Sequence, residues 1–184
     1  MGRNSREGAT QTREHLLVIA DRLFAERGYA ETKIDVIASM AGFTRGAFYR
    51  HFQSKEDLFL ALLDHRSERQ QSEWLQLDSP EGSRSVTRWY EMNLKRQRGF
   101  DAAVREFIAY AARRPDLLAR LRQREVATLD TLAGFMPDDT GLSRRDLAAM
   151  VLAVGEGLAD QLTLSNPRKA ELFSAAMALI TRRS

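Results

Sequence analysis

The sequence predicts an all-α protein of roughly nine helices. Apolar residues recur at helical spacing through most of the 184 residues, and glycines, prolines and capping side chains separate the periodic segments. No segment shows the alternation of apolar and polar residues that is typical of a strand, and no internal repeat is found. The hydrophobic share of 43% provides enough apolar material for a core.

Composition excludes several classes of protein. The chain has no cysteine, which rules out a disulfide framework and thiolate zinc sites and is typical of a reducing compartment. The longest apolar runs are far shorter than the roughly 18 residues that span a bilayer, and the polar N-terminus has no secretory signal. We therefore expect a cytoplasmic protein without a membrane partner. The net charge of +3 is too small to indicate nucleic acid by itself.

The first helix is predicted by an apolar stripe over 16–24 that keeps the spacing of one helix face. Gly28 suits the left-handed backbone position that follows many helix ends. A short second helix is expected next, because Thr32 and Asp35 form a capping-box pattern in front of an apolar face. Gly42 ends this second helix.

A third helix is expected from Thr44, a favourable N-cap, to about Phe52. Ser54 opens a longer helix with a second capping-box pattern, and this helix runs to about Leu77. The stretch LDSPEGS, from Leu77 to Ser83, is the strongest loop signal. Further helices are predicted over 84–96 and 100–112, and after Pro115, Ser143 and Pro167.

The first three predicted helices have the layout of a helix-turn-helix, with a tight glycine-containing turn between the second and the third. Phe48 and Phe52 lie four residues apart on the third helix, so we expect both to pack on the earlier helices. The opposite arc of that helix holds small and basic residues. Such a helix can enter a major groove about 12 Å wide, because small residues allow close approach and arginine bonds guanine bidentately.

The sequence therefore predicts a DNA-binding surface around the third helix. Arg45, Ala47 and Arg50 are expected to read bases, and Gly46 leaves room for close approach. Contacts to the phosphate backbone are expected from Thr32, Thr44, Tyr49, His51 and Lys55. The alternative is structural, since caps occur in every helical protein and an arginine on a helix is commonly solvated.

The segment TKIDVIASMAGFTRGAFYRHFQSKEDLFLALL resembles the N-terminal DNA-binding region of TetR-type transcriptional repressors. The family pattern T…IA…AGVS.G..Y.HF.SKE.L is matched at spaced positions from Thr32 to Leu58. The preceding LLVIADRLFAERGYAET is similar to the first helix of that family, so the resemblance covers about residues 12–63. Phe43 and Phe48 depart from the pattern, but both are apolar replacements.

The resemblance implies a homodimer that binds double-stranded DNA, and a divergent helical C-terminal domain that binds a small-molecule effector and thereby weakens DNA binding. A twofold dimer also suits a palindromic operator, because two modules about 34–36 Å apart read successive major-groove faces. We therefore expect a DNA-binding domain over 1–53, with 1–10 as a flexible arm. The ligand-binding and dimerisation domain is expected over 54–184.

The last two helices carry the dimerisation signal. The stretch AAMVLAVGEGLADQL is apolar on more than one face, and its two glycines allow a partner helix to approach closely. A role for both helices in the core of a single chain stays open. The residues predicted for the dimer interface are Val151, Val154, Gly155, Leu158, Leu162, Phe173, Ala176, Leu179 and Ile180.

The middle helices hold the candidates for an effector cavity. Aromatic residues and methionines at helical spacing are commonly core residues, so a core role is the alternative for each of them. The candidate lining residues are Trp89, Tyr90, Met92, Asn93, Glu106, Phe107, Tyr110 and Met150.

Other functions fit the sequence less well than a ligand-responsive repressor does. The three histidines show no metal-binding spacing, and no nucleophile elbow, phosphate loop or dinucleotide fingerprint occurs, so we expect neither an enzyme nor a cofactor or metal. A DNA-binding activator or a ligand-independent regulator would use the same DNA chemistry. A helical protein-interaction module would need Phe48 and Phe52 but neither Arg45 nor Arg50.

Overall fold

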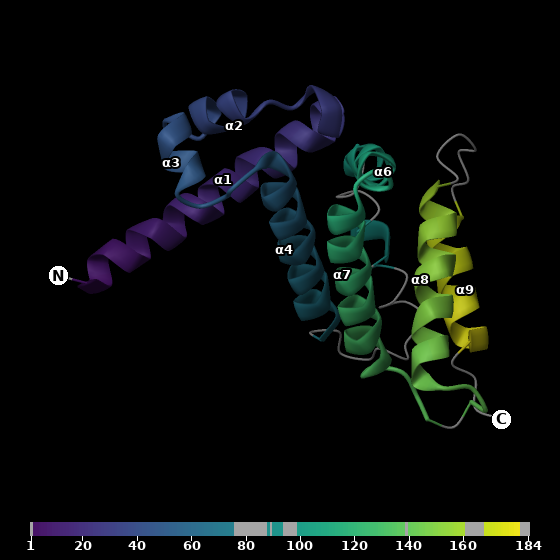
Figure 1. Ribbon diagram of the computed structural model, residues 1–184. Helices are drawn as coiled ribbons and strands as arrows, with labels where there is room; N and C mark the ends of the chain where they lie inside the picture. Colours follow the sequence, from purple (N-terminus) through teal and green to yellow (C-terminus); the bar gives the residue numbers. More distant parts are fainter. Residues whose placement is uncertain are drawn as a thin grey trace. The chain divides into compact units, whose positions relative to one another are not determined.

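The computed structural model describes residues 2–75, 88, 90–93, 99–138, 140–160 and 168–180. Within these ranges every regular element is a helix, as the sequence predicts (Figure 1). The chain divides into two compact units, of which unit 1 is Met1–Glu68 with Gln97–Leu118 and unit 2 is Arg69–Arg96 with Ala119–Ser184. The sequence placed the boundary after residue 53, whereas unit 1 also includes two later segments of the chain.

Unit 1 contains the predicted helix-turn-helix. Its elements are α1 (Gly2–Glu31), α2 (Ile34–Met40), α3 (Arg45–Tyr49), most of α4 (Lys55–Leu75) and α6 (Phe100–Ala111). α1 begins at Gly2, so residues 2–10 are helical where the sequence predicted a flexible arm. α2 and α3 pack against each other, and α1 packs on both α2 and α6.

The end of α1 is shaped by Gly28, whose φ of 78° and ψ of 176° interrupt the helical backbone. Only glycine adopts this conformation readily. The Thr32 hydroxyl donates a hydrogen bond to the Gly28 carbonyl at 2.7 Å. The Glu106 carboxylate of α6 accepts from the Ala30 amide at 2.9 Å, and a Cβ on Gly28 would meet this carboxylate. The side chain of Glu106 on α6 therefore packs against the end of α1 and bonds its backbone.

The turn between α2 and α3 depends on Gly42, whose φ is 76°. The amides of Gly42 and Phe43 bond the carbonyls of Ser39 and Ala38 at 3.0 and 2.9 Å, which satisfies the end of α2. Thr44 then caps α3, as predicted, because its hydroxyl oxygen accepts from the Ala47 amide at 3.2 Å. This short turn sets the position of α3 beside α2.

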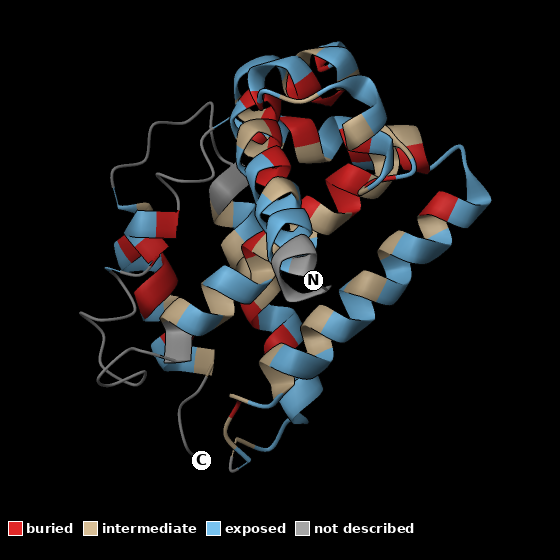
Figure 2. Ribbon diagram, turned by 90° about the vertical axis from the view of Figure 1, so that its left-hand side faces the viewer, coloured by how far each residue is buried: buried red, intermediate tan, exposed pale blue. Residues whose placement is uncertain are grey.

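The core of unit 1 is rich in aromatic residues. Figure 2 colours the buried positions of the chain red. Phe59 of α4 lies 4.5 Å from Phe107 and 4.9 Å from Phe24, measured between ring centroids, and all three side chains are buried. Phe48 and Phe52 are also buried, which confirms the prediction that they attach α3 to its scaffold. Burying aromatic side chains of this size is the main source of stability for so short a helix as α3.

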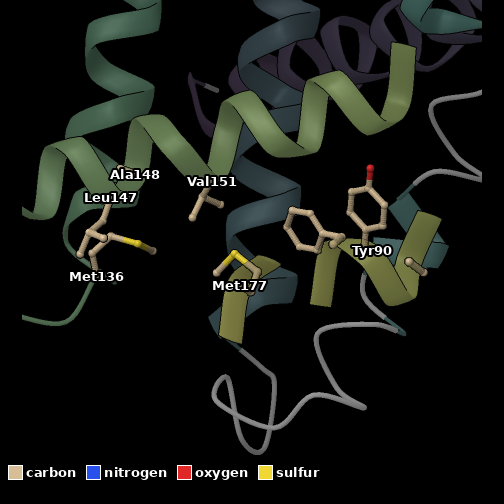
Figure 3. Packing of buried hydrophobic residues seen from close by; sticks show 8 residues of the cluster. Tyr90, Met136, Leu147, Ala148, Val151 and Met177 are labelled. Carbon is tan, nitrogen blue, oxygen red and sulfur yellow. The ribbon is translucent and has the colours of Figure 1, made fainter. Parts of the chain in front are cut away.

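Unit 2 contains the rest of α7 (Pro115–Ala133), which starts in unit 1, together with α8 (Arg144–Asp160) and α9 (Lys169–Ile180). Its core cluster joins α8 and α9 (Figure 3). Tyr90 stacks on Phe173 with ring centroids 4.1 Å apart, and its hydroxyl donates to the Gly155 carbonyl at 3.0 Å. None of the helices described is long and apolar enough to cross a membrane.

Candidate nucleic-acid interface

α3 has two faces of opposite character. Phe48 is buried against unit 1, while Ala47 and His51 are partly exposed. The exposed residues on and beside the helix are Thr44, Arg45, Gly46, Tyr49 and Arg50. The structure therefore brings seven of the nine residues predicted for DNA contact to one surface.

α3 ends at Tyr49, three residues earlier than the sequence indicated. The amides of His51 and Phe52 still donate to the Phe48 carbonyl at 2.9 and 3.1 Å, so a hydrogen-bonded turn follows the end of α3. Arg50 and His51 consequently leave α3 from a turn that remains attached to the buried Phe52.

Arg45 is held by two neighbours. Its Nη1 atom donates to Asp35 Oδ2 at 3.1 Å, and its Nη2 atom donates to the Tyr49 hydroxyl at 3.4 Å. The guanidinium also lies 5.7 Å from the centre of the Tyr49 ring. The hydrogen bond to Tyr49 and the charge of Asp35 raise the pKa of Arg45 above its ordinary value, so this residue is a fixed cation.

Arg50 differs from Arg45 in its surroundings. Its side chain is exposed, and within the described ranges it has neither an ion pair nor a hydrogen bond. This surface therefore has one ordered cation, Arg45, and one cation without a partner among the described residues, Arg50.

Asp35 was not predicted as a site residue, because the sequence suggested only a helix-capping role for it. Its position could have been found from the sequence, because the start of the second helix lies beside the start of the third helix in a helix-turn-helix.

The sequence predicted that Lys55 contacts a phosphate, but in the structure its ammonium is bonded within the fold. Its ammonium donates to the carbonyls of Tyr29, Ala30 and Thr32 at 2.9, 3.3 and 3.1 Å. It also lies 4.3 Å from the centre of the Tyr29 ring. Burial lowers the pKa of Lys55, although the nearby Glu56 carboxylate favours its charged form. The end of α1 and the start of α4 meet here, and Lys55 joins them through these hydrogen bonds.

Thr32 is the second predicted contact that the structure places inside the fold. Its side chain is buried, and its hydroxyl donates to the carbonyls of Gly28 and Leu23. It is also not the cap of α2, because that helix starts after Lys33 without a side-chain cap. The turn after Gly28 draws Thr32 back toward α1, which local sequence patterns do not reveal.

α4 and α6 also meet through a polar contact. The Tyr110 hydroxyl donates to Glu56 Oε1 at 2.5 Å, and the Arg114 guanidinium lies 3.5 Å from the centre of the Tyr110 ring. Burial opposes ionisation of Glu56. The hydrogen bonds from Tyr110, from the backbone and from Ser54, with the charge of Lys55, outweigh it and lower the pKa of Glu56 below its ordinary value. This carboxylate is therefore charged near neutral pH.

The residues predicted to line an effector cavity are divided between the two units. Glu106, Phe107 and Tyr110 belong to unit 1, where Phe107 is core and the other two make the hydrogen bonds described above. Trp89 lies outside the described residues. The others are in unit 2, where Tyr90 and Asn93 are buried, and Met92 and Met150 are exposed.

One surface depression of about 640 Å³ lies at the end of α6. It is lined by Ala109, Tyr110, Arg113 and Arg114, so it includes only one of the predicted lining residues. Helical spacing indicated which residues face inward but did not separate a ligand cavity from the aromatic core.

Most residues predicted for the dimer interface face the core of unit 2. Val151 and Phe173 are buried in its cluster, and Val154, Leu158 and Ile180 pack against that cluster. Gly155 lies against Phe173, Ala176 is partly buried, and Leu162 is outside the described residues. Leu179 is the exception, because 72% of its side chain is exposed. The sequence pattern was apolar on several faces of each helix and did not show which face was left uncovered.

The arrangement of α1 to α3, with an exposed basic face over a buried aromatic one, is that of a helix-turn-helix module. Residues 16–62 match the family described as "Bacterial regulatory proteins, tetR family". This module is therefore similar to the N-terminal DNA-binding module of the TetR family.

Two relatives and one solved structure extend the comparison. The chain is 48% identical over 59 residues to the HTH-type transcriptional regulator AcrR of Shigella flexneri, an alignment that covers 32% of this chain and 27% of that protein. It is 27% identical over 165 residues to the HTH-type transcriptional activator FasR of Mycolicibacterium smegmatis, covering 83% and 70%. SCO4454, a TetR-family transcriptional regulator from Streptomyces coelicolor, superposes with a TM-score of 0.69 at 26% identity, covering 94% and 95%.

Proposed function

We propose that this chain is a transcriptional regulator that binds double-stranded DNA sequence-specifically, with α3 in the major groove. The observation that carries the proposal is the exposed surface of α3 and of the turn that follows it, where two arginines, a tyrosine and a glycine lie on the side opposite the buried Phe48. An interaction module without DNA binding would not need both cations there. The regulator acts in the cytoplasm, where its operator is accessible.

The positions of the exposed residues support the following roles. Arg45, Ala47 and Arg50 face the bases, and Gly46 allows close approach. Thr44, Tyr49 and His51 contact the phosphate backbone. Thr32 and Lys55 are left out of the interface, because their polar atoms are bonded to backbone carbonyls of unit 1.

The regulator is a homodimer that pairs through α8 and α9. On α8 the exposed Met150, Ala153 and Gly157 recur at i, i+3 and i+7, and on α9 the exposed Leu172, Ala175 and Leu179 recur at the same spacing. Both are apolar or small-residue stripes without a partner among the described residues. Two copies of these stripes form a four-helix interface of the kind that twofold dimers use. A twofold dimer reads a palindromic operator.

A small-molecule effector controls the affinity for DNA, and the TetR-type relationship supports this part of the proposal. Repression is the main expectation for the direction of control. One relative described above is named an activator, so a promoter carrying the selected operator upstream of a reporter should be measured with and without the regulator. Lower output with the regulator supports repression, and higher output supports activation.

The experiment that tests DNA binding is selection of bound sites from random duplex DNA with the full chain. A palindromic site should be enriched, and the logarithm of its binding constant should fall with the logarithm of salt concentration with a slope near −5, if the dimer neutralises roughly six phosphates. Failure to enrich any site, or association that does not respond to salt, would show that the proposed function is wrong.

A further inference from the structure

We propose that Asp35 is a specificity-determining residue for DNA recognition, because its carboxylate holds the Arg45 guanidinium in one orientation on the exposed face of α3. The inference rests on the proposed DNA-binding function and deepens it. It assigns a role at the interface to an acidic residue on α2, where the charge alone would oppose binding to a polyanion.

The geometry that carries the inference joins two helices. Asp35 lies in the first turn of α2, and Arg45 is the first residue of α3. The turn at Gly42 brings them together, with Nη1 of Arg45 3.1 Å from Oδ2 of Asp35. Tyr49 confines the guanidinium from α3 itself, by the hydrogen bond at 3.4 Å and by its ring. The cation is therefore oriented by groups on both helices before any ligand arrives.

An oriented guanidinium discriminates between bases better than a mobile one. Arginine has five N–H donors, and the contacts to Asp35 and Tyr49 use two of them, which leaves three for the edge of a base. Less side-chain entropy is lost when an ordered arginine binds. A base that does not match the fixed donors leaves them unpaired, so the wrong sequence is penalised more strongly.

The pair does little for folding. Both side chains are 62% exposed, and ion pairs this exposed contribute little to stability. The Asp35 charge also repels phosphates wherever the protein binds DNA. Binding is then favoured where Arg45 finds its matching base and disfavoured elsewhere, which is how a repulsive group increases specificity. Arg50, exposed on the same surface and unpaired within the described ranges, has no such constraint.

The test compares binding preferences of full-length variants on the selected operator and on each of its single-base variants, with random duplex DNA as competitor. The variants are Asp35→Asn, Arg45→Ala and the double substitution. The matched control is Glu26→Gln, which removes the same charge from an exposed ion pair with Arg22 on α1, at 3.8 Å. Thermal unfolding is measured for all of them.

We expect Asp35→Asn to reduce the preference at one operator position about three- to tenfold and to tighten binding to random DNA, with unchanged thermal stability. Arg45→Ala should abolish the preference at that same position, and adding Asp35→Asn to Arg45→Ala should not change the base preferences further. Glu26→Gln should leave every preference as it is.

Three results would overturn the inference. In the first, Asp35→Asn keeps all base preferences of the wild type. In the second, it changes them equally with and without Arg45, which would make its effect independent of that arginine. In the third, the wild type enriches no site at all, and the proposed function then falls together with the inference. The first two leave the proposed function standing.

Discussion

At the scale of single residues, Lys55 has the most informative position. Its side chain looks like a phosphate contact in the sequence, but its ammonium meets three carbonyls at the end of α1. Carbonyls at a helix end have no partner inside the helix, so a cation there satisfies them and also interacts well with the helix dipole. This lysine therefore ties the start of α4 to the end of α1.

Replacing Lys55 with methionine should lower the free energy of unfolding by about 1–3 kcal/mol, because the partly buried carbonyls lose their donor. Chemical denaturation followed by circular dichroism measures the change. Lys33→Met is the matched control, since Lys33 is exposed on the same unit and should be nearly neutral for stability. Equal stability of both variants would show that the Lys55 contacts do not stabilise the fold.

The pair of Glu56 and Tyr110 makes stability depend on pH. The pKa of Glu56 is lowered in the folded chain, so its contribution is present above the ordinary pKa of about 4.3 and is lost as the pH falls through the folded value. Tyr110→Phe should therefore be less stable than the wild type at pH 7, and the difference should shrink below about pH 4. Urea denaturation across this range measures it. A difference that stays constant with pH would rule out the carboxylate as the partner of Tyr110.

At the scale of elements, α1, α2 and α6 are linked at one backbone turn. Gly28 adopts a conformation that other residues rarely reach, and the Glu106 carboxylate lies against it while accepting from the Ala30 amide. The orientation of the helix-turn-helix thus depends on α6, which is distant in sequence. This explains why unit 1 includes residues 97–118 as well as the N-terminal helices.

Gly28→Ala should destabilise the chain by about 1–3 kcal/mol, because its backbone is strained for an L-residue and its Cβ would meet the Glu106 carboxylate. Gly8→Ala is the control within the same helix. No other atom lies within 4 Å of the Cβ position at Gly8, so alanine should be neutral or stabilising by up to about 1 kcal/mol. Thermal unfolding of both variants separates the two effects, and a neutral Gly28→Ala would contradict the strained turn.

At the scale of the whole molecule, the proposed dimer depends on which faces of α8 and α9 the core covers. One face of each helix fills the core around Phe173 and Leu147, and the opposite stripes are apolar and exposed. Exposed apolar stripes on adjacent helices are typical of an association surface. The uncovered stripes, which share only Leu179 with the residues first predicted, are therefore the proposed dimer contacts.

Leu179→Arg should weaken the proposed dimer by about 2 kcal/mol or more, because a charged side chain would replace an apolar one at the helix contact. Sedimentation equilibrium measures the dissociation constant. Ile108→Arg, at a residue of α6 that is 50% exposed, should leave it unchanged. If both variants associate like the wild type, α9 is not the dimer contact.

The sequence by itself determined the helical class, the helix-turn-helix and the inward positions of Phe48 and Phe52. Caps at Thr44 and Ser54 were also correct, since the Ser54 hydroxyl accepts from the Asp57 amide at 3.1 Å. These features are local: they depend on helical periodicity, on capping side chains and on glycine, which act over a few residues.

Only the tertiary structure decided which polar groups meet across long separations. Lys55 reaches carbonyls more than 20 residues earlier, Glu106 reaches an amide 76 residues earlier, and Asp35 meets Arg45 across a turn. It also decided which stripes of α8 and α9 the core covers. Such contacts depend on how helices pack, and helices with apolar residues on several faces can pack in more than one way. The physical reason is that periodicity specifies a face, while packing specifies its partner.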